Sequence, residues 1–210
     1  SRRHSAILPM LGLHPWYAPE AAPGWLEHLA SFAEAERIGI GECGLDFALP
    51  DADRELQEKV FRGQLRLARG LDRPISIHCR KAWEPLAAIA REEGLPKAGA
   101  VIHAFSGSAE VARELQDLGF HLGFGCSLAN PANTRGPKAV RAVAEERLLF
   151  ETDAPDIPPR LPGTDVSAPN EPANIRLAAE VAARLRDEPL EVLASRVHAN
   201  ALRVFGGLLP

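Results

Sequence analysis

Cysteine is scarce in this sequence of 210 residues, and its arrangement suits neither a disulfide framework nor a thiolate metal site. Cys43, Cys79 and Cys126 are odd in number, have no C-x-x-C spacing, and lie within or at the end of apolar runs. Such cysteines are typical of reduced, buried side chains in a cytosolic protein. We therefore expect a cytoplasmic location and no structural disulfide.

Long hydrophobic runs are also missing. No apolar stretch approaches the roughly 18 to 20 residues that a membrane helix needs. The N-terminal Ser-Arg-Arg-His is not followed by a signal-peptide core before Pro9. We therefore expect no export signal and no membrane partner.

The charge balance gives no general attraction to polyanions. The 24 Lys and Arg residues against 28 Asp and Glu residues leave a net charge of −4, so nucleic-acid binding would need a local basic patch or bound cations. With 46% hydrophobic and 25% charged residues, the sequence is globular, which excludes a disordered or collagen-like chain. A chain of this length buries roughly 70% of its unfolded surface, so a metal would be functional and not needed for folding.

Short apolar runs alternate with longer segments of helical periodicity along the whole chain. This alternation predicts an α/β fold with a parallel sheet, in a single domain covering residues 1–210. A Pro-rich passage at 154–172 fits neither period and predicts an ordered loop over a site. The expected strands are Ala6–Leu13, Ile38–Cys43, Pro74–Cys79, Gly99–Phe105, Phe120–Cys126 and Leu148–Thr152.

Helical stripes separate these strands. Leu56, Val60, Leu67 and Leu71 are spaced to share one face of a helix, and the sets at 25–32, 111–118, 175–185 and 193–204 follow the same period. We expect these faces to pack against the sheet.

Residues that can bind a metal stand on or next to the ends of five of the six strands. Because the carboxyl ends of parallel barrel strands point to one face, side chains distant in sequence converge there. Imidazole and carboxylate ligands without thiolates suit a hydrolytic cation. A single His at a strand end is more often a packing residue, but five such positions together favour a metal site. The five residues are His14, Glu42, His78, His103 and Asp153.

The motifs at these positions resemble those of the TatD-type metal-dependent deoxyribonucleases, within the amidohydrolase-like barrel superfamily. The resemblance covers essentially the whole chain, and the motifs occur in the order of the family. IGECGLD together with ETDAP is more specific than any single His. The matching runs are GLHP, IGECGLDF, PISIHCR, GAVIHAFSGS, LLFETDAPDIP, PNEPANI and NALRVFG.

The resemblance implies a (β/α) TIM-like barrel of the metallo-dependent hydrolase type. It also implies one or two divalent cations per chain (Zn, Mn or Mg) and hydrolysis of DNA phosphodiesters, often from a 3′ end of single-stranded DNA. Carried over by motif, Glu42 would bridge two metals, His78 and His103 would bind one of them, and Asp153 would ligate the other and help to activate water. The family does not use His14 as a standard ligand, and we expect it to contact substrate or only its own loop.

Phosphate contacts are expected from donors near these positions. Ser106 and Ser108 lie between a strand and a helix, where free N–H groups and the helix dipole favour an anion. Ser108 capping the helix is an equally good interpretation. Arg80, two residues beyond His78, would point to the same side and could grip a phosphate, or pair with an acidic residue at the rim.

Two further interpretations stay open at this point. Asp46 either supports the metal ligands or forms an Asx turn or a helix cap. Trp16, Phe47 and Trp83 follow strand ends, where they either stack on bases or pack the loops.

One part of the family pattern has no counterpart. Members generally begin with a strand carrying His-x-His, then a helix and a second strand, before the segment that corresponds to Ala6–Leu13. His4 cannot replace those ligands. We expect a barrel that lacks its first two strands, most simply because the natural N-terminal segment is missing from this sequence.

Two other functions remain as alternatives. The same scaffold supports hydrolysis of other esters or amides, including aminoacyl-tRNA, because its chemistry varies with its loops. The missing His-x-His would also suit a non-catalytic barrel remnant, although retention of four ligand-type residues opposes this. Oligomeric state is not predicted.

Overall fold

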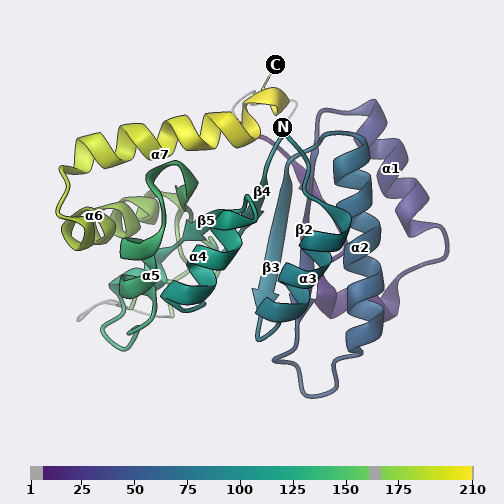
Figure 1. The fold of residues 1–210 in the computed structure, drawn as a ribbon, viewed down its shortest axis with the longest axis horizontal. Helices are drawn as coiled ribbons and strands as arrows, with labels where there is room; N and C mark the ends of the chain where they lie inside the picture. Colours follow the sequence, from purple (N-terminus) through teal and green to yellow (C-terminus); the bar gives the residue numbers. More distant parts are fainter. Residues whose placement is uncertain (1–6, 161–166, 210) are drawn as a thin grey trace. The chain divides into compact units, whose positions relative to one another are not determined.

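The computed structural model describes residues 7–160 and 167–209. Their contacts divide the chain into two compact units, one formed by Ser1–Ile102 with Leu202–Pro210 and the other by His103–Ala201. The single domain expected from the sequence stays a prediction, and each unit is described by itself (Figure 1).

The first unit contains four parallel strands that pair in chain order. Helix α2 packs along β2 and also contacts α1 and α3 (Figure 1). The elements are β1 (Met10–Leu11), the 3-10 helix η1 (Pro15–Glu20), α1 (Trp25–Ala35), β2 (Gly39–Asp46), α2 (Arg54–Gly70), β3 (Ile75–Arg80), α3 (Trp83–Glu93) and β4 (Ala100–Ile102).

The second unit contains a parallel pair of strands with helices α4, α5 and α6 around it. The last helix, α7, begins here and ends in the first unit. The elements are α4 (Ala109–Asp117), β5 (His121–Phe124), η2 (Cys126–Ala129), α5 (Gly136–Ala142), η3 (Glu145–Arg147), β6 (Leu148–Phe150), η4 (Pro172–Asn174), α6 (Ile175–Arg186), α7 (Leu190–Phe205) and η5 (Gly206–Leu208).

All six predicted strands are present in the predicted order, although most are shorter than expected. Ala6, at the start of the first predicted strand, lies outside the described residues. The described parts of the Pro-rich passage contain no helix or strand before η4, as expected, and positions 161–166 are not described. Among the described residues no helix is both long and apolar enough to cross a membrane.

Strand β2 is longer than its apolar run indicated. It continues to Asp46, so Glu42 lies inside the strand and not at its end, and the expectation of a strand end at this position was wrong. The pairing register with β3 shifts between Ile40 and Cys43, as in a β-bulge. Such an irregularity re-aims side chains, and Glu42 is partly exposed while its neighbours are buried.

The core of each unit is apolar and closely covered. In the first unit Ile40, Leu45, Ile75 and Ile77 on the strands are fully buried. In the second, Leu122 and Leu148 from the strand pair and Leu115 from α4 have almost no exposed surface. Burial of a side chain of this size stabilises the fold by about 1.5–3 kcal/mol, so these strands hold the attached site residues firmly in place.

The buried face of α2 differs from the predicted stripe. Val60 is buried as expected, but Leu67 and Leu71 are only partly buried, and the core is contacted by Phe61 and Leu65 instead. Phe32 of α1, also expected to pack inward, is 59% exposed.

Two buried glutamines explain why the buried face of α2 differs from the predicted stripe. Gln64 exchanges two hydrogen bonds with the backbone of Leu13, its Nε2 donating to the carbonyl and its Oε1 accepting from the N–H. Gln57 does the same with the backbone of Asp46. These bonds satisfy backbone groups that would otherwise be costly to bury. The inward face of α2 therefore includes two glutamines among its apolar residues, and they fix the backbone at Asp46 and next to His14.

Candidate metal centre

Two groups of potential metal ligands occur among the described residues, one in each unit. His14, Glu42 and His78 form the first, and His103, Glu151 and Asp153 form the second. Within each group the nitrogen and oxygen atoms lie within 4.8 Å of one another. The sequence predicted five of these six residues, and the structure distributes them between the two groups.

The first group is centred on the Glu42 carboxylate. Its Oε1 lies 3.0 Å from Nδ1 of His78 and 3.3 Å from Nε2 of His14. Glu42 comes from the irregular part of β2, and His78 comes from β3, where it pairs with Gly44. A Cβ atom at Gly44 would lie 2.1 Å from the His78 carbonyl oxygen, so only glycine permits this approach of the strands.

Asp46 controls the orientation of His78. Its Oδ2 lies 3.1 Å from Nε2 of His78 and accepts a hydrogen bond of 2.8 Å from Nε1 of Trp16, while its Oδ1 accepts from the N–H of Ala48. Asp46 has no exposed surface. Burial alone would raise the pKa of Asp46, but the hydrogen bonds from Trp16, Ala48 and His78 outweigh this and lower the pKa below its ordinary value. Asp46 forms the expected turn through Ala48 and also contacts His78, and its support of a metal ligand stays a prediction.

The proton positions that follow from these contacts suit a cation. In the tautomer that donates from Nε2 to Asp46, His78 turns the Nδ1 lone pair toward the Glu42 carboxylate. Two acceptors 3.0 Å apart repel one another unless a positive charge lies with them. An imidazole and a carboxylate are also the donors that hydrolytic divalent cations take, so Glu42 and His78 fit a metal.

His14 is oriented differently. It caps η1, with its Nδ1 accepting from the N–H of Trp16 at 3.3 Å. The proton of the neutral ring is then on Nε2, which points at Glu42. His14 in this arrangement presents an N–H donor and not a lone pair to Glu42, and its contact with substrate stays a prediction.

The second group joins one imidazole to two carboxylates. Nδ1 of His103 lies 3.2 Å from Oδ1 of Asp153 and 3.4 Å from Oε2 of Glu151. Oε1 of Glu151 accepts a hydrogen bond from the N–H of Ala104, which fixes the carboxylate against the loop after β4. Neighbouring carboxylates repel one another, and a divalent cation or a protonated imidazole removes this repulsion. This donor set also fits a metal.

Glu151 is the site residue that the sequence interpretation missed. The signal was present, because Glu151 and Asp153 are two residues apart after β6 and side chains at that spacing share one side of an extended chain. The prediction that His78 and His103 share one metal stays a prediction.

The predicted phosphate contacts are placed as follows. Arg80 is 55% exposed at its side chain and lies 3.6 Å from Asp46, so it has an acidic partner at the rim. Ser108 caps α4, accepting from the N–H of Val111 at 3.3 Å, and Ser106 is exposed just before it. Their roles toward phosphate stay predictions.

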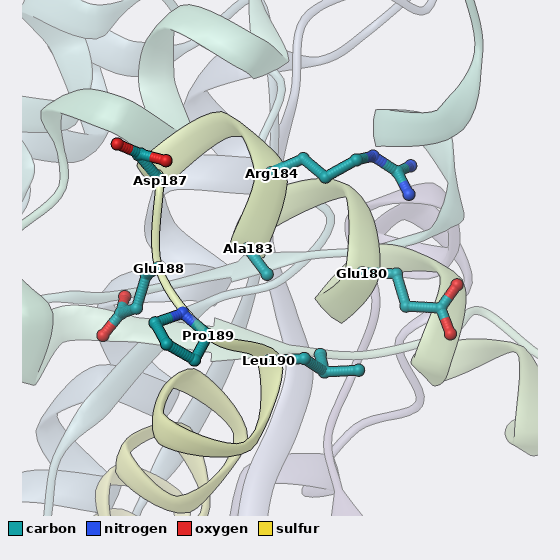
Figure 2. A pocket seen from close by; sticks show the side chains of 7 residues that line it. All are labelled: Glu180, Ala183, Arg184, Asp187, Glu188, Pro189 and Leu190. Atoms are coloured by element: carbon teal, nitrogen blue, oxygen red, sulfur yellow. The ribbon is translucent and has the colours of Figure 1, made fainter.

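A hollow of about 590 Å³ in the second unit shares no residue with either ligand group. It lies where α6 turns into α7 and is lined by charged side chains, among them Glu180, Arg184, Asp187 and Glu188 (Figure 2). Glu188 is paired with Arg196, and its neighbour Glu180 with Arg176. These pairs neutralise two of the charged side chains that line the hollow.

Comparisons with known proteins identify the family. Residues 1–206 match the family model described as TatD-related DNase. The chain belongs to the TatD-related DNase family. It is 35% identical over 202 residues to an uncharacterized metal-dependent hydrolase of Bacillus subtilis, YabD, covering 95% of this chain and 77% of that one. It is 37% identical over 199 residues to the protein of Pantoea ananatis named 3′-5′ ssDNA/RNA exonuclease TatD, covering 93% of this chain and 76% of that one.

The solved structures support the same assignment. The TatD homologue YjjV of Escherichia coli K12 superimposes with a TM-score of 0.91 at 30% identity, over 98% of this chain and 79% of that one. A TatD-family hydrolase from Entamoeba histolytica gives 0.78 at 24% identity, over 94% and 74%. The expected TIM-like barrel of the metallo-dependent hydrolase type is confirmed, and the chain is a TatD-type metal-dependent hydrolase.

Proposed function

We propose that this hydrolase is a deoxyribonuclease that removes nucleotides from the 3′ end of single-stranded DNA. The observation that carries the proposal is the pair of ligand groups, each holding imidazole and carboxylate atoms within 4.8 Å, on a chain of the TatD-related DNase family. Relatives at 35–37% identity that are named 3′-5′ ssDNA/RNA exonucleases support the substrate class.

The cofactor we propose is one or two divalent cations, Zn, Mn or Mg. Glu42 and His78 would hold a cation in the first group, and His103, Glu151 and Asp153 in the second. When bound, such a cation shields the phosphate charge and lowers the pKa of a bound water toward neutrality.

The side chains of the protein supply the remaining chemistry. The N–H of His14 points at the Glu42 carboxylate, and a phosphate oxygen bound beside that carboxylate would accept a hydrogen bond from it. Asp153 is partly exposed beside His103, so its carboxylate can accept the proton of the attacking water. Arg80 is exposed near the first group and binds phosphate through its guanidinium, and Ser106 and Ser108 contribute hydroxyl donors at the start of α4.

The rest of the chain fits this activity. The three cysteines are free and buried, which suits a protein of the reducing cytoplasm. We place all of residues 1–210 in one hydrolase domain.

The test is hydrolysis of a single-stranded oligonucleotide labelled at its 5′ end, with Mn²⁺ and with chelator. Glu42→Gln removes the charge that faces both imidazoles and should lower kcat by at least about 100-fold, in the range seen when a group acting on the transition state is lost. Glu84→Gln, an exposed change on α3, is the matched control. Full turnover in chelator, or in Glu42→Gln, would contradict the proposal, and hydrolysis of carboxylic esters with none of DNA would assign a different substrate.

A further inference from the structure

A second hollow lies beside the first ligand group, within the first unit. Its volume is about 260 Å³, and its walls come from η1, the loop between β2 and α2, and the start of α2. Pockets for drug-sized ligands are usually about 300–1,000 Å³, so this hollow is suited to a single ring system. Pro15, Trp16, Pro19, Leu49 and Pro50 provide its apolar walls.

The walls of this hollow are rigid. Prolines have a fixed φ angle, and three of them line it. The Trp16 indole is 49% exposed, yet its Nε1 is held by the hydrogen bond to Asp46. The amide of Gln57, which also lines the hollow, is bound to the backbone of Asp46. A flat ligand would enter a preformed site and would order few side chains on binding.

Trp16 links the hollow to the candidate metal centre. The centroid of its indole lies 4.9 Å from the ring of His14 and 6.3 Å from the ring of His78. A phosphate bound at those imidazoles and a flat ring stacked on the indole would be close together. Their spacing would suit a base and a phosphate of the same nucleotide or of neighbouring nucleotides. Stacking of bases on aromatic side chains is the usual means of holding single-stranded nucleic acid.

The negative charge of the hollow disfavours binding of a phosphate there, in addition to the one at the metal centre. Asp51 and Asp53 both line it, and their carboxylates repel anions. Carboxylates accept hydrogen bonds from amino groups, such as the N4 amino group of cytosine. Asp53 already caps α2 by accepting from Leu56, so the exposed Asp51 is the acceptor for a ligand.

We propose that this hollow is a subsite for one nucleobase of the single-stranded substrate, with a preference for a base that carries an amino group. The proposal rests on the proposed nuclease function, because the phosphate next to that base would be the one at the metal centre.

The variant that tests the subsite is Ala52→Phe. Ala52 lines the hollow, and a phenyl ring there would occupy the space of a base. Trp16 is unsuitable, since its replacement would also remove the hydrogen bond to Asp46. Ala22→Phe, an exposed change between η1 and α1 that does not line the hollow, is the control.

The kinetic measurement compares oligonucleotides that end in two deoxycytidines or in two abasic sugars. In the wild-type protein KM for the abasic substrate should be about ten-fold higher or more, in line with the loss of one base stack. Ala52→Phe should raise KM for the deoxycytidine substrate by a similar factor. It should leave kcat and KM for the abasic substrate unchanged. Equal KM values for the two substrates in the wild-type protein would overturn the subsite while leaving the nuclease activity standing.

Binding without turnover separates the two proposals. Calorimetry with Mn²⁺ should show tighter binding of deoxycytidine monophosphate than of deoxyribose 5-phosphate, and Ala52→Phe should abolish the difference. This result with no cleavage of DNA would retain the subsite and reject the nuclease function. Thymidine monophosphate should bind several-fold more weakly than deoxycytidine monophosphate, and equal affinities would overturn the role of Asp51.

Discussion

Oδ2 of Asp46 lies 3.1 Å from Nε2 of His78, and this contact determines which nitrogen of His78 faces Glu42. A carboxylate that orients a ligating imidazole typically contributes 10- to 100-fold to metal affinity. We therefore expect Asp46→Asn to weaken the affinity for Mn²⁺ or Zn²⁺ by about 10- to 100-fold, measured by calorimetric titration. Asp117→Asn, an exposed change at the end of α4, is the control. Unchanged affinity in Asp46→Asn would show that His78 is oriented without this carboxylate.

Glu151 provides a test of the second ligand group. Glu151→Gln keeps an oxygen that can accept from Ala104 but removes the charge beside His103 and Asp153. The metal content per chain should fall relative to wild type, because a neutral amide is a weaker ligand than a carboxylate. It can be measured by inductively coupled plasma mass spectrometry after dialysis. Glu146→Gln is an exposed neighbour in η3 and should retain the wild-type content. Equal metal content in all three proteins would exclude Glu151 as a ligand.

Acid stability should depend on Glu93, which joins α3 to α2. Hydrogen bonds from Arg66, at 2.6 and 2.8 Å, and from Arg62 lower the pKa of Glu93 from 4.5 to about 2. Because the folded-state pKa is depressed, the contribution to stability is complete above the unfolded pKa of 4.5 and is lost as the pH falls through about 2. Glu93→Gln should therefore make Tm fall less steeply over this range, measured by circular dichroism.

The control for this experiment is Glu84→Gln on the same helix, whose side chain is exposed. It should show the wild-type slope of Tm with pH. A wild-type slope in Glu93→Gln as well would mean that other carboxylates carry the acid sensitivity.

Asn200 ties α7 to the strand β6. Its Nδ2 donates to the carbonyls of Glu145, at 2.7 Å, and Leu148, at 2.9 Å, and the residue is 2% exposed. Asn200→Ala leaves these carbonyls without this donor, which should lower the free energy of unfolding by about 1–3 kcal/mol in urea denaturation. His198→Ala on the exposed side of α7 should change it by less than about 0.5 kcal/mol. A similarly small effect for Asn200→Ala would contradict this role.

Apolar runs and their order were sufficient to predict the strands of both units. They identify strands because residues covered on both faces of a parallel sheet are almost all hydrophobic. The extension of β2 was not predictable in this way, since Gly44 and Asp46 interrupt the apolar pattern and are buried by contacts with β3 and Trp16. The face of α2 was misjudged for a related reason, because Gln57 and Gln64 are buried by hydrogen bonds that hydrophobicity does not reveal.

The site was predictable to the extent that it follows strand ends. His78 near the end of β3, and His103 and Asp153 after β4 and β6, were identified from their motifs, and they lie in the two ligand groups. Glu151 was not predicted, because ETDAP holds two carboxylates and which of them contact His103 depends on tertiary structure. The link from Trp16 through Asp46 to His78 consists of contacts between residues 30 and 32 positions apart in the sequence. A local sequence pattern does not reveal such contacts.

Helix α2 contributes no ligand, yet Gln64 holds the backbone of Leu13, next to His14, and Gln57 holds that of Asp46. The geometry of the first ligand group is thus maintained by hydrogen bonds from a helix that supplies no ligand atom. Loosening this helix by heat would displace both attachment points together. Because Val60, Phe61 and Leu65 of the same helix lie in the core, we expect the site geometry and the fold of this unit to be lost together on heating.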